Sequence, residues 1–92
     1  MTRRVVTRVE SLPIGEEGAT EAGRRAATRA AADLLTEICG ERLGPEDVEI
    51  TRTTGGAPRA TIPRIPDRPI EISITHTRTT AYGMAAVEDA DE

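Results

Sequence analysis

The chain has 92 residues, a length typical of one small domain that buries about 60 to 65% of the surface its unfolded form exposes. Its net charge is −4 and all twelve basic residues are arginine, which argues against a general nucleic-acid binder and excludes lysine-based Schiff-base or phosphate chemistry. The single cysteine excludes an internal disulfide, and because the sequence contains no recognisable signal peptide and no long apolar run, we expect a cytoplasmic protein.

The apolar composition indicates a thin core. Phe and Trp are missing, and Ile, Val and Leu together supply only 17 of the 92 residues, against thirteen Ala. This is near the composition at which a chain no longer buries enough apolar surface to fold alone. We therefore expect a homo-oligomer in which the subunits bury surface against one another.

The N-terminal segment Arg4–Leu12 alternates with the period of two that is typical of a half-buried strand, and Pro13 is expected to end it. One face of this strand would carry Val5, Thr7 and Val9, and the other Val6, Arg8 and Glu10.

A helix is predicted over Glu21–Ile38, with Thr20 as its N-cap and Gly40 as its stop. Glu21 precedes Arg25 by four residues, the favourable orientation for a helical ion pair. Apolar residues recur at three- and four-residue spacing, at Ala27, Ala30, Ala31, Leu34, Leu35 and Ile38.

Two hairpins are predicted after the helix. The first joins strands Val48–Thr53 and Arg59–Ile62 through the turn Thr54–Pro58. The second joins the alternating segment Arg68–Thr77 to the short apolar run Tyr82–Val87. The only histidine, His76, lies where the first strand of that second hairpin leaves the sheet.

These elements predict a single α+β domain over residues 1–92, with one Ala-rich helix packed on a small antiparallel sheet of hairpins. The acidic tail Glu88–Glu92 is expected to be a solvated, frayed end.

The order and spacing of several short motifs resemble the holo-acyl-carrier-protein synthase family, the small 4′-phosphopantetheinyl transferases. The segment Gly23–Ala30 resembles the family's Gly-Arg-aromatic-Ala-Ala-Lys-Glu-Ala helix. Gly55–Pro58 resembles its Asn-Gly-Lys-Pro turn, and Ser73–Thr77 resembles its Ser-Ile-Ser/Thr-His-Thr strand end. The likeness runs from Ala22 to about Val87.

The resemblance implies transfer of the phosphopantetheine arm of coenzyme A to an acyl carrier protein in fatty acid or polyketide biosynthesis, by a homotrimer that uses Mg²⁺. Two departures alter that expectation. Arg8 and Arg29 stand where the family has its metal-binding Asp and Glu, and Thr28 stands where it has a phosphate-binding Lys. A register slip on the first strand would restore one carboxylate, Glu10. Because an arginine cannot coordinate Mg²⁺, the metal is not expected here.

A second departure is one of length. Only about ten residues, Pro13 to Ala22, replace a family region of several tens of residues that docks the carrier protein.

Each candidate site residue has a structural and a functional interpretation. His76 is either a hydrogen-bonded structural residue or a base toward an incoming hydroxyl. Gly55 and Gly56 either form a tight turn or face a nucleotide. The arginines of the helix either form a solvated face or bind phosphate groups. The predicted phosphate or CoA ligands are Arg8, Arg24, Arg29, Thr28, Gly55, Gly56, Ser73 and Thr75.

Three functions remain open from the sequence. The first is a degenerate member of the family, a pseudoenzyme that binds an acyl carrier protein, a CoA-like anion or a synthase-like partner subunit without Mg²⁺-dependent transfer. The second is an active transferase that uses arginine in place of the metal, with His76 as base. The third is a structural or regulatory oligomerisation module.

Overall fold

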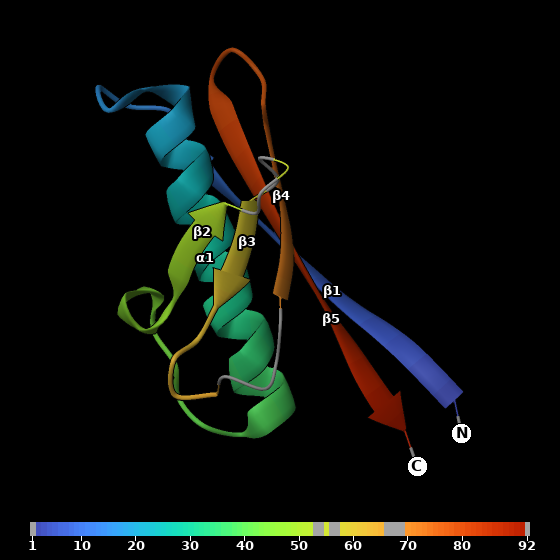
Figure 1. The fold of residues 1–92 in the computed structure, drawn as a ribbon. Helices are drawn as coiled ribbons and strands as arrows, with labels where there is room; N and C mark the ends of the chain where they lie inside the picture. The colour runs from blue at the N-terminus through green and yellow to red at the C-terminus, as the bar shows by residue number, and fades with distance from the viewer. Residues whose placement is uncertain (1, 53–54, 56–57, 66–69, 92) are drawn as a thin grey trace.

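The computed structural model describes residues 2–52, 55, 58–65 and 70–91, and it confirms the α+β class. The strands form one antiparallel sheet in the order β1-β5-β4-β3-β2, and α1 covers one of its faces (Figure 1). The elements are β1 (Thr2–Pro13), α1 (Gly18–Cys39), the 3₁₀ turn η1 (Pro45–Asp47), β2 (Glu49–Arg52), β3 (Pro58–Thr61), β4 (Ile70–His76) and β5 (Thr80–Asp91). We call the face under α1 the inner face and the opposite one the open face.

Helix α1 begins earlier than its sequence predicts. The N-cap is Glu17 and not Thr20, and its side chain makes no capping hydrogen bond. Gly18 adopts a φ of 90°, which glycine tolerates because it has no Cβ, so the chain turns directly into the helix. Arg25 consequently pairs with Glu17, at 3.2 Å between Nη1 and Oε1, and not with Glu21.

The predicted end of α1 is confirmed. Gly40 has a φ of 74°, and its N–H donates to the carbonyl of Thr36 at 3.0 Å. This left-handed residue after the last turn is the usual glycine termination of a helix.

Small residues bring α1 close to the inner face of the sheet. Ala26, Ala27 and Ala30 are fully buried on the helix, and Gly83 lies beneath them on β5. A Cβ placed on Gly83 would collide with the backbone of Ala27. The Ala-rich pattern of the helix therefore produces a tight helix–sheet contact.

The core is as thin as the composition predicts. Among the described residues, nine of the sixteen buried hydrophobic side chains are alanines. The largest fully buried side chains are Leu34, Leu35, Ile62, Ile70 and Val87.

The alternation predicted for β4 is confirmed. Ile70 and Ile72 are buried against α1, and Ile74 is half-buried. Glu71, Ser73 and Thr75 are exposed on the open face. The predicted hairpin with β5 is also present, with His76 opposite Ala81.

The first predicted hairpin is confirmed where it is described, since β2 and β3 pair antiparallel from Glu49 opposite Thr61 to Arg52 opposite Pro58. Thr53, Thr54, Gly56 and Ala57 of its turn lie outside the described residues, as do residues 66–69 before β4.

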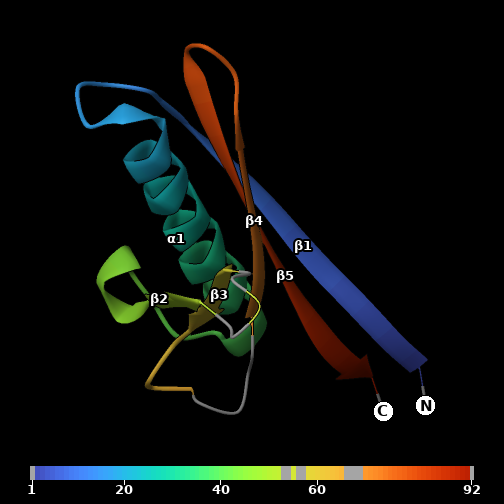
Figure 2. The same ribbon diagram turned by 45° about the horizontal axis from the view of Figure 1, so that its top comes forward.

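The sequence predicted that the acidic tail Glu88–Glu92 is a frayed end, and the structure differs over residues 88–91. Residues 88–91 continue β5, and β1 pairs with this strand along its whole length, from Thr2 opposite Asp91 to Pro13 opposite Thr80. The two strands form a ribbon that extends past the helix and brings the chain ends side by side (Figure 2). Pairing with β1 thus overrides the low strand propensity of the acidic residues. No helix in the described ranges combines the length and apolar composition needed to cross a membrane.

Candidate functional site

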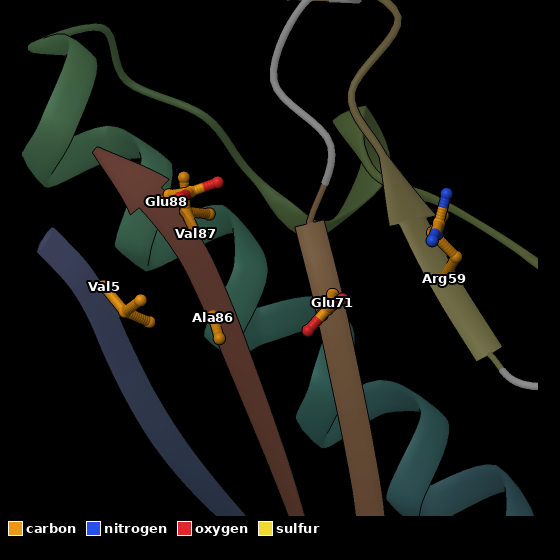
Figure 3. A pocket seen from close by; sticks show the side chains of 6 residues that line it. All are labelled: Val5, Arg59, Glu71, Ala86, Val87 and Glu88. Carbon is orange, nitrogen blue, oxygen red and sulfur yellow. The ribbon is translucent and has the colours of Figure 1, made fainter. Parts of the chain in front are cut away.

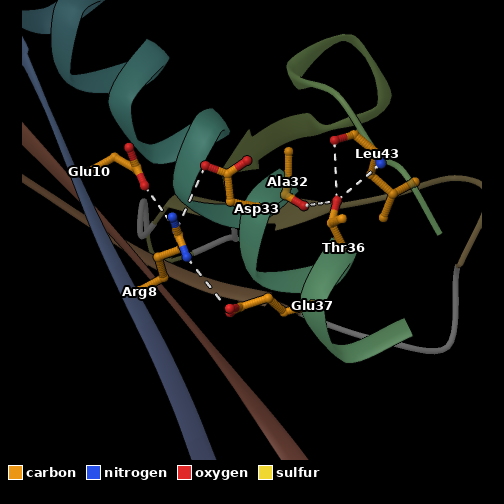
Figure 4. A network of polar contacts seen from close by, with 7 residues as sticks. All are labelled: Arg8, Glu10, Ala32, Asp33, Thr36, Glu37 and Leu43. Atoms are coloured by element: carbon orange, nitrogen blue, oxygen red, sulfur yellow. Dashed lines mark hydrogen bonds and ion pairs between the residues drawn. The ribbon is translucent and has the colours of Figure 1, made fainter. Parts of the chain in front are cut away.

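Arg8 lies on the inner face of β1 and is surrounded by carboxylates (Figure 4). Its Nε is 2.9 Å from Oε2 of Glu10 and 3.7 Å from Oδ2 of Asp33. Its Nη1 is 3.7 Å from Oε2 of Glu37, on the next turn of α1. The hydrogen bond to Glu10, with smaller contributions from the other two charges, raises the pKa of Arg8 above its ordinary value.

Arg8 was predicted to bind phosphate, and the structure places it among three carboxylates. Its positive charge is already matched by three carboxylates, so it joins β1 to α1 and leaves little attraction for an anion. Arg29 takes no part in the network, and the cavity that Arg29 lines does not include Arg8.

Arginines of α1 border two further cavities. A cavity of 470 Å³ is bordered by Leu12, Arg25, Thr28, Arg29 and Pro45. A neighbouring cavity of 290 Å³ is bordered by Arg24, Thr28, Pro45, Val48 and Ile50. We call Arg24, Arg25, Thr28 and Arg29 the helix arginine patch.

Thr28 lies at the centre of this patch, because it borders both cavities. Its hydroxyl donates to the carbonyl of Arg24 at 2.7 Å, one helical turn earlier. Among the described residues, Arg24 and Arg29 form no ion pair, whereas Arg25 is paired with Glu17. Within the described part of the chain, the patch thus presents two guanidinium groups without a carboxylate partner, beside the apolar side chains of Leu12 and Pro45.

His76 is exposed at the end of β4 and has a local hydrogen-bond partner. Its Nδ1 is 3.0 Å from the carbonyl of Thr77. The hairpin turn beyond it is closed by Thr77, whose N–H donates to the carbonyl of Thr80 and whose hydroxyl accepts the N–H of Thr80. His76 does not border the two cavities of the helix arginine patch.

The remaining predicted ligands are also separated. Ser73 and Thr75 project from the open face, on the other side of the sheet from α1. Gly55 is exposed with open space where a Cβ would lie, and Gly56 is outside the described residues. Of the predicted set, the structure brings together Arg24, Thr28 and Arg29.

A hollow of 250 Å³ on the open face was not anticipated (Figure 3). Arg59 on β3 lies directly opposite Glu71 on β4, which in turn is opposite Ala86 on β5. The lining is completed by Val5, Val87 and Glu88. No local pattern indicates this hollow, because its residues come from four strands and meet only once the pairing register is known.

The residues present do not fit the Mg²⁺ that the family resemblance implies. The carboxylates nearest the expected position, Glu10, Asp33 and Glu37, have the guanidinium of Arg8 between them. A search of the described residues found no group of three His, Cys, Asp or Glu side chains able to hold a metal ion.

Comparison with protein-family models, curated proteins and solved structures found no match.

Proposed function

We propose that the protein is a degenerate holo-acyl-carrier-protein synthase-like binding protein, which holds a CoA-like anion at the helix arginine patch without Mg²⁺-dependent transfer. The observation that carries this proposal is that Arg24 and Arg29, which form no ion pair among the described residues, border two neighbouring cavities that meet at Thr28. The order of motifs in the sequence supplies the chemical class of the ligand.

The chemistry of the patch suits a ligand that has both phosphate and apolar parts. Guanidinium groups form paired, charge-assisted hydrogen bonds to phosphate oxygens. Leu12 and Pro45 add apolar surface on the margin of the larger cavity, where a non-phosphate part of the ligand would lie. The cavity is open to solvent, so the attraction is screened by salt.

The test is a calorimetric titration of CoA into the wild-type protein and into Arg29→Gln. Loss of one exposed charge-assisted contact is expected to weaken CoA binding about three- to tenfold. Arg42→Gln is the matched control, because Arg42 is exposed, forms no ion pair among the described residues and lies outside both cavities. Equal affinities for all three proteins, or no binding by the wild type, would contradict the proposal.

Transfer is tested separately, by intact mass of an apo acyl carrier protein after incubation with the protein, CoA and Mg²⁺. A conventional synthase serves as the positive control. We expect no gain of the phosphopantetheine mass. A gain would favour the active-transferase alternative, and a His76→Ala variant would then test the base.

A second candidate function, binding of a synthase-like partner subunit, is favoured by the open face. Val9 and Met84 are opposite each other on β1 and β5, and both are exposed together with the neighbouring Tyr82. Native mass spectrometry with a conventional synthase is expected to show a heteromer that Met84→Glu weakens. Absence of a heteromer would remove this candidate and leave the anion-binding proposal intact.

A further inference from the structure

Strand β1 presents a long unpaired edge. It is the outermost strand of the sheet, and its twelve residues pair with β5 on one side (Figure 2). Within the described part of the chain, no strand pairs with its other side. Such an edge is a template for a further strand, and natural proteins usually shorten or interrupt it.

The hydrogen-bonding groups of this edge can be assigned from one bond. The N–H of Ile14 donates to the carbonyl of Thr79 at 2.9 Å, and this pair continues the register in which Pro13 is opposite Thr80. The directions of the backbone N–H and C=O groups alternate along a strand. In β1 these backbone groups therefore point toward β5 at the even-numbered residues. At the odd-numbered residues the backbone groups point outward, away from β5. The outward N–H groups belong to Arg3, Val5, Thr7, Val9 and Ser11. Pro13, which has no N–H, falls in the outward set, where it breaks no bond to β5.

The outward groups are self-complementary in one register. If two copies of β1 pair antiparallel with Thr7 opposite Thr7, then Val5 is opposite Val9 and Arg3 is opposite Ser11. Each of these pairs exchanges both backbone hydrogen bonds, so every outward N–H of both copies finds a carbonyl. Centring the pair on Val9 instead leaves Arg3 unpaired and places Val5 opposite Pro13.

The side chains favour the same register. On the inner face it places Arg4 opposite Glu10 of the second copy, twice by symmetry, and opposite charges at directly facing positions are favourable. A register centred on Arg8 would place that arginine opposite Arg8 of the second copy. A register centred on Val6 would place Arg4 opposite Arg8 of the second copy. Both alternative registers therefore bring like charges together. Glu10 already accepts from Arg8 within its own chain, so the new pair would extend an existing network.

The open face gains an apolar contact. Val5 and Val9 are 63% and 57% exposed in the single chain, so both side chains have apolar surface left to bury. In the Thr7 register each Val5 is covered by Val9 of the second copy. Each Val9, which is opposite Met84 on β5, then has Val5 of the second copy as its other neighbour.

We propose that β1 pairs with β1 of a second copy of this chain, antiparallel and with Thr7 opposite Thr7, so that two five-stranded sheets form one continuous sheet. The contact is isologous, because the same strand is used by both copies, and it closes as a two-fold dimer. It does not depend on ligand binding at the helix arginine patch.

The test uses two doubly substituted proteins with changes at the same exposed positions. Val5→Lys with Val9→Lys places like charges opposite each other twice in the Thr7 register. Val5→Glu with Val9→Lys places opposite charges there. In a register centred on Val9, the second protein would instead place lysine opposite lysine.

Sedimentation equilibrium measures the outcome, with circular dichroism to show that each variant is folded. We expect twice the 9.9 kDa chain mass for the wild type and for the Val5→Glu, Val9→Lys protein, and at least tenfold weaker association for the double-lysine protein. The proposal would be overturned by a wild type that is monomeric at about 100 μM or trimeric. It would also be overturned if both pairs of changes weakened association equally.

Amide hydrogen exchange gives an independent readout. In the dimer, the outward N–H groups of Val5, Thr7 and Val9 are expected to be protected, and dilution to monomer should remove that protection. The inward N–H groups of Val6 and Arg8 bond to β5 and should remain protected in both states. Fast exchange of Thr7 in a sample that sedimentation shows to be dimeric would also overturn the proposal.

Discussion

Gly83 of β5 lies directly against the backbone of Ala27 in α1, so closely that a Cβ on Gly83 would overlap the backbone nitrogen and Cα of Ala27. The obstacle is backbone and not the end of a flexible side chain, so neither element can yield locally. Gly83→Ala is therefore expected to push the helix from the sheet and to lower the free energy of unfolding by about 1 to 3 kcal/mol or more. Urea denaturation followed by circular dichroism measures the loss.

Gly55→Ala is the matched control for this prediction. Gly55 is exposed, and nothing lies within 4 Å of the Cβ position. The control should change stability by no more than about 0.5 kcal/mol. Equal stabilities for the two variants would mean that α1 does not pack on the sheet as closely as described.

Arg8 provides a second prediction, on pH dependence. Replacing it by Met removes the cation between Glu10, Asp33 and Glu37 and leaves three carboxylates close together. Like charges repel, and carboxylates as a class are charged in neutral solution and take up protons in acid, so the variant should lose more stability at pH 7 than at pH 4.

The raised pKa of Arg8 itself does not produce this pH dependence. Its stabilising contribution is fully present below the unfolded-state value and is lost only as pH rises through the higher folded-state value, in strongly alkaline solution. Thermal unfolding of Arg8→Met at both pH values checks the prediction, with Arg42→Met as the exposed control. A loss that is the same at both pH values would show that the three carboxylates do not repel one another.

The sequence predicted those parts of the fold that depend on local periodicity. The alternation of Ile70, Ile72 and Ile74 identified β4, and the three- and four-residue spacing of Ala and Leu identified α1, because each pattern states directly which side chains face the core. The start of α1 was missed because it depends on the left-handed conformation of Gly18. The extent of β5 was missed because pairing with β1 stabilises it.

The candidate site was harder to predict, since its members meet only through tertiary packing. Asp33 and Glu37 lie on the side of α1 that crosses β1, and no local pattern places them beside Arg8. The separation of Ser73 and Thr75 from the helix arginine patch was, however, present in the sequence. The alternation that placed the isoleucines toward the helix necessarily places these two residues on the opposite face.

Thr36 provides a third prediction, because its hydroxyl joins the end of α1 to the loop that follows. It donates to the carbonyl of Ala32 at 2.8 Å and accepts the N–H of Leu43 at 3.0 Å. Leu43 is buried, so Thr36→Val would leave its N–H without this partner and should cost about 1 to 3 kcal/mol. Thr28→Val is the matched control, because that hydroxyl bonds only to the carbonyl of Arg24 within its own helix and should be nearly neutral. Denaturation curves that shift equally for both variants would contradict this role of Thr36.

The C-terminal residues provide the fourth prediction. The even-numbered N–H groups of β1 point toward β5, and Arg4 is opposite Asp89. Removing residues 88–92 takes away the strand opposite Arg4 but leaves Val6 opposite Val87. The amide of Arg4 should then exchange with solvent nearly as fast as in an unstructured peptide, while that of Val6 stays protected. Removing Glu92 alone is the control and should leave both amides protected. If Arg4 exchanges at the same rapid rate in the full chain, the acidic tail is a frayed end after all and the β1–β5 ribbon stops near Val87.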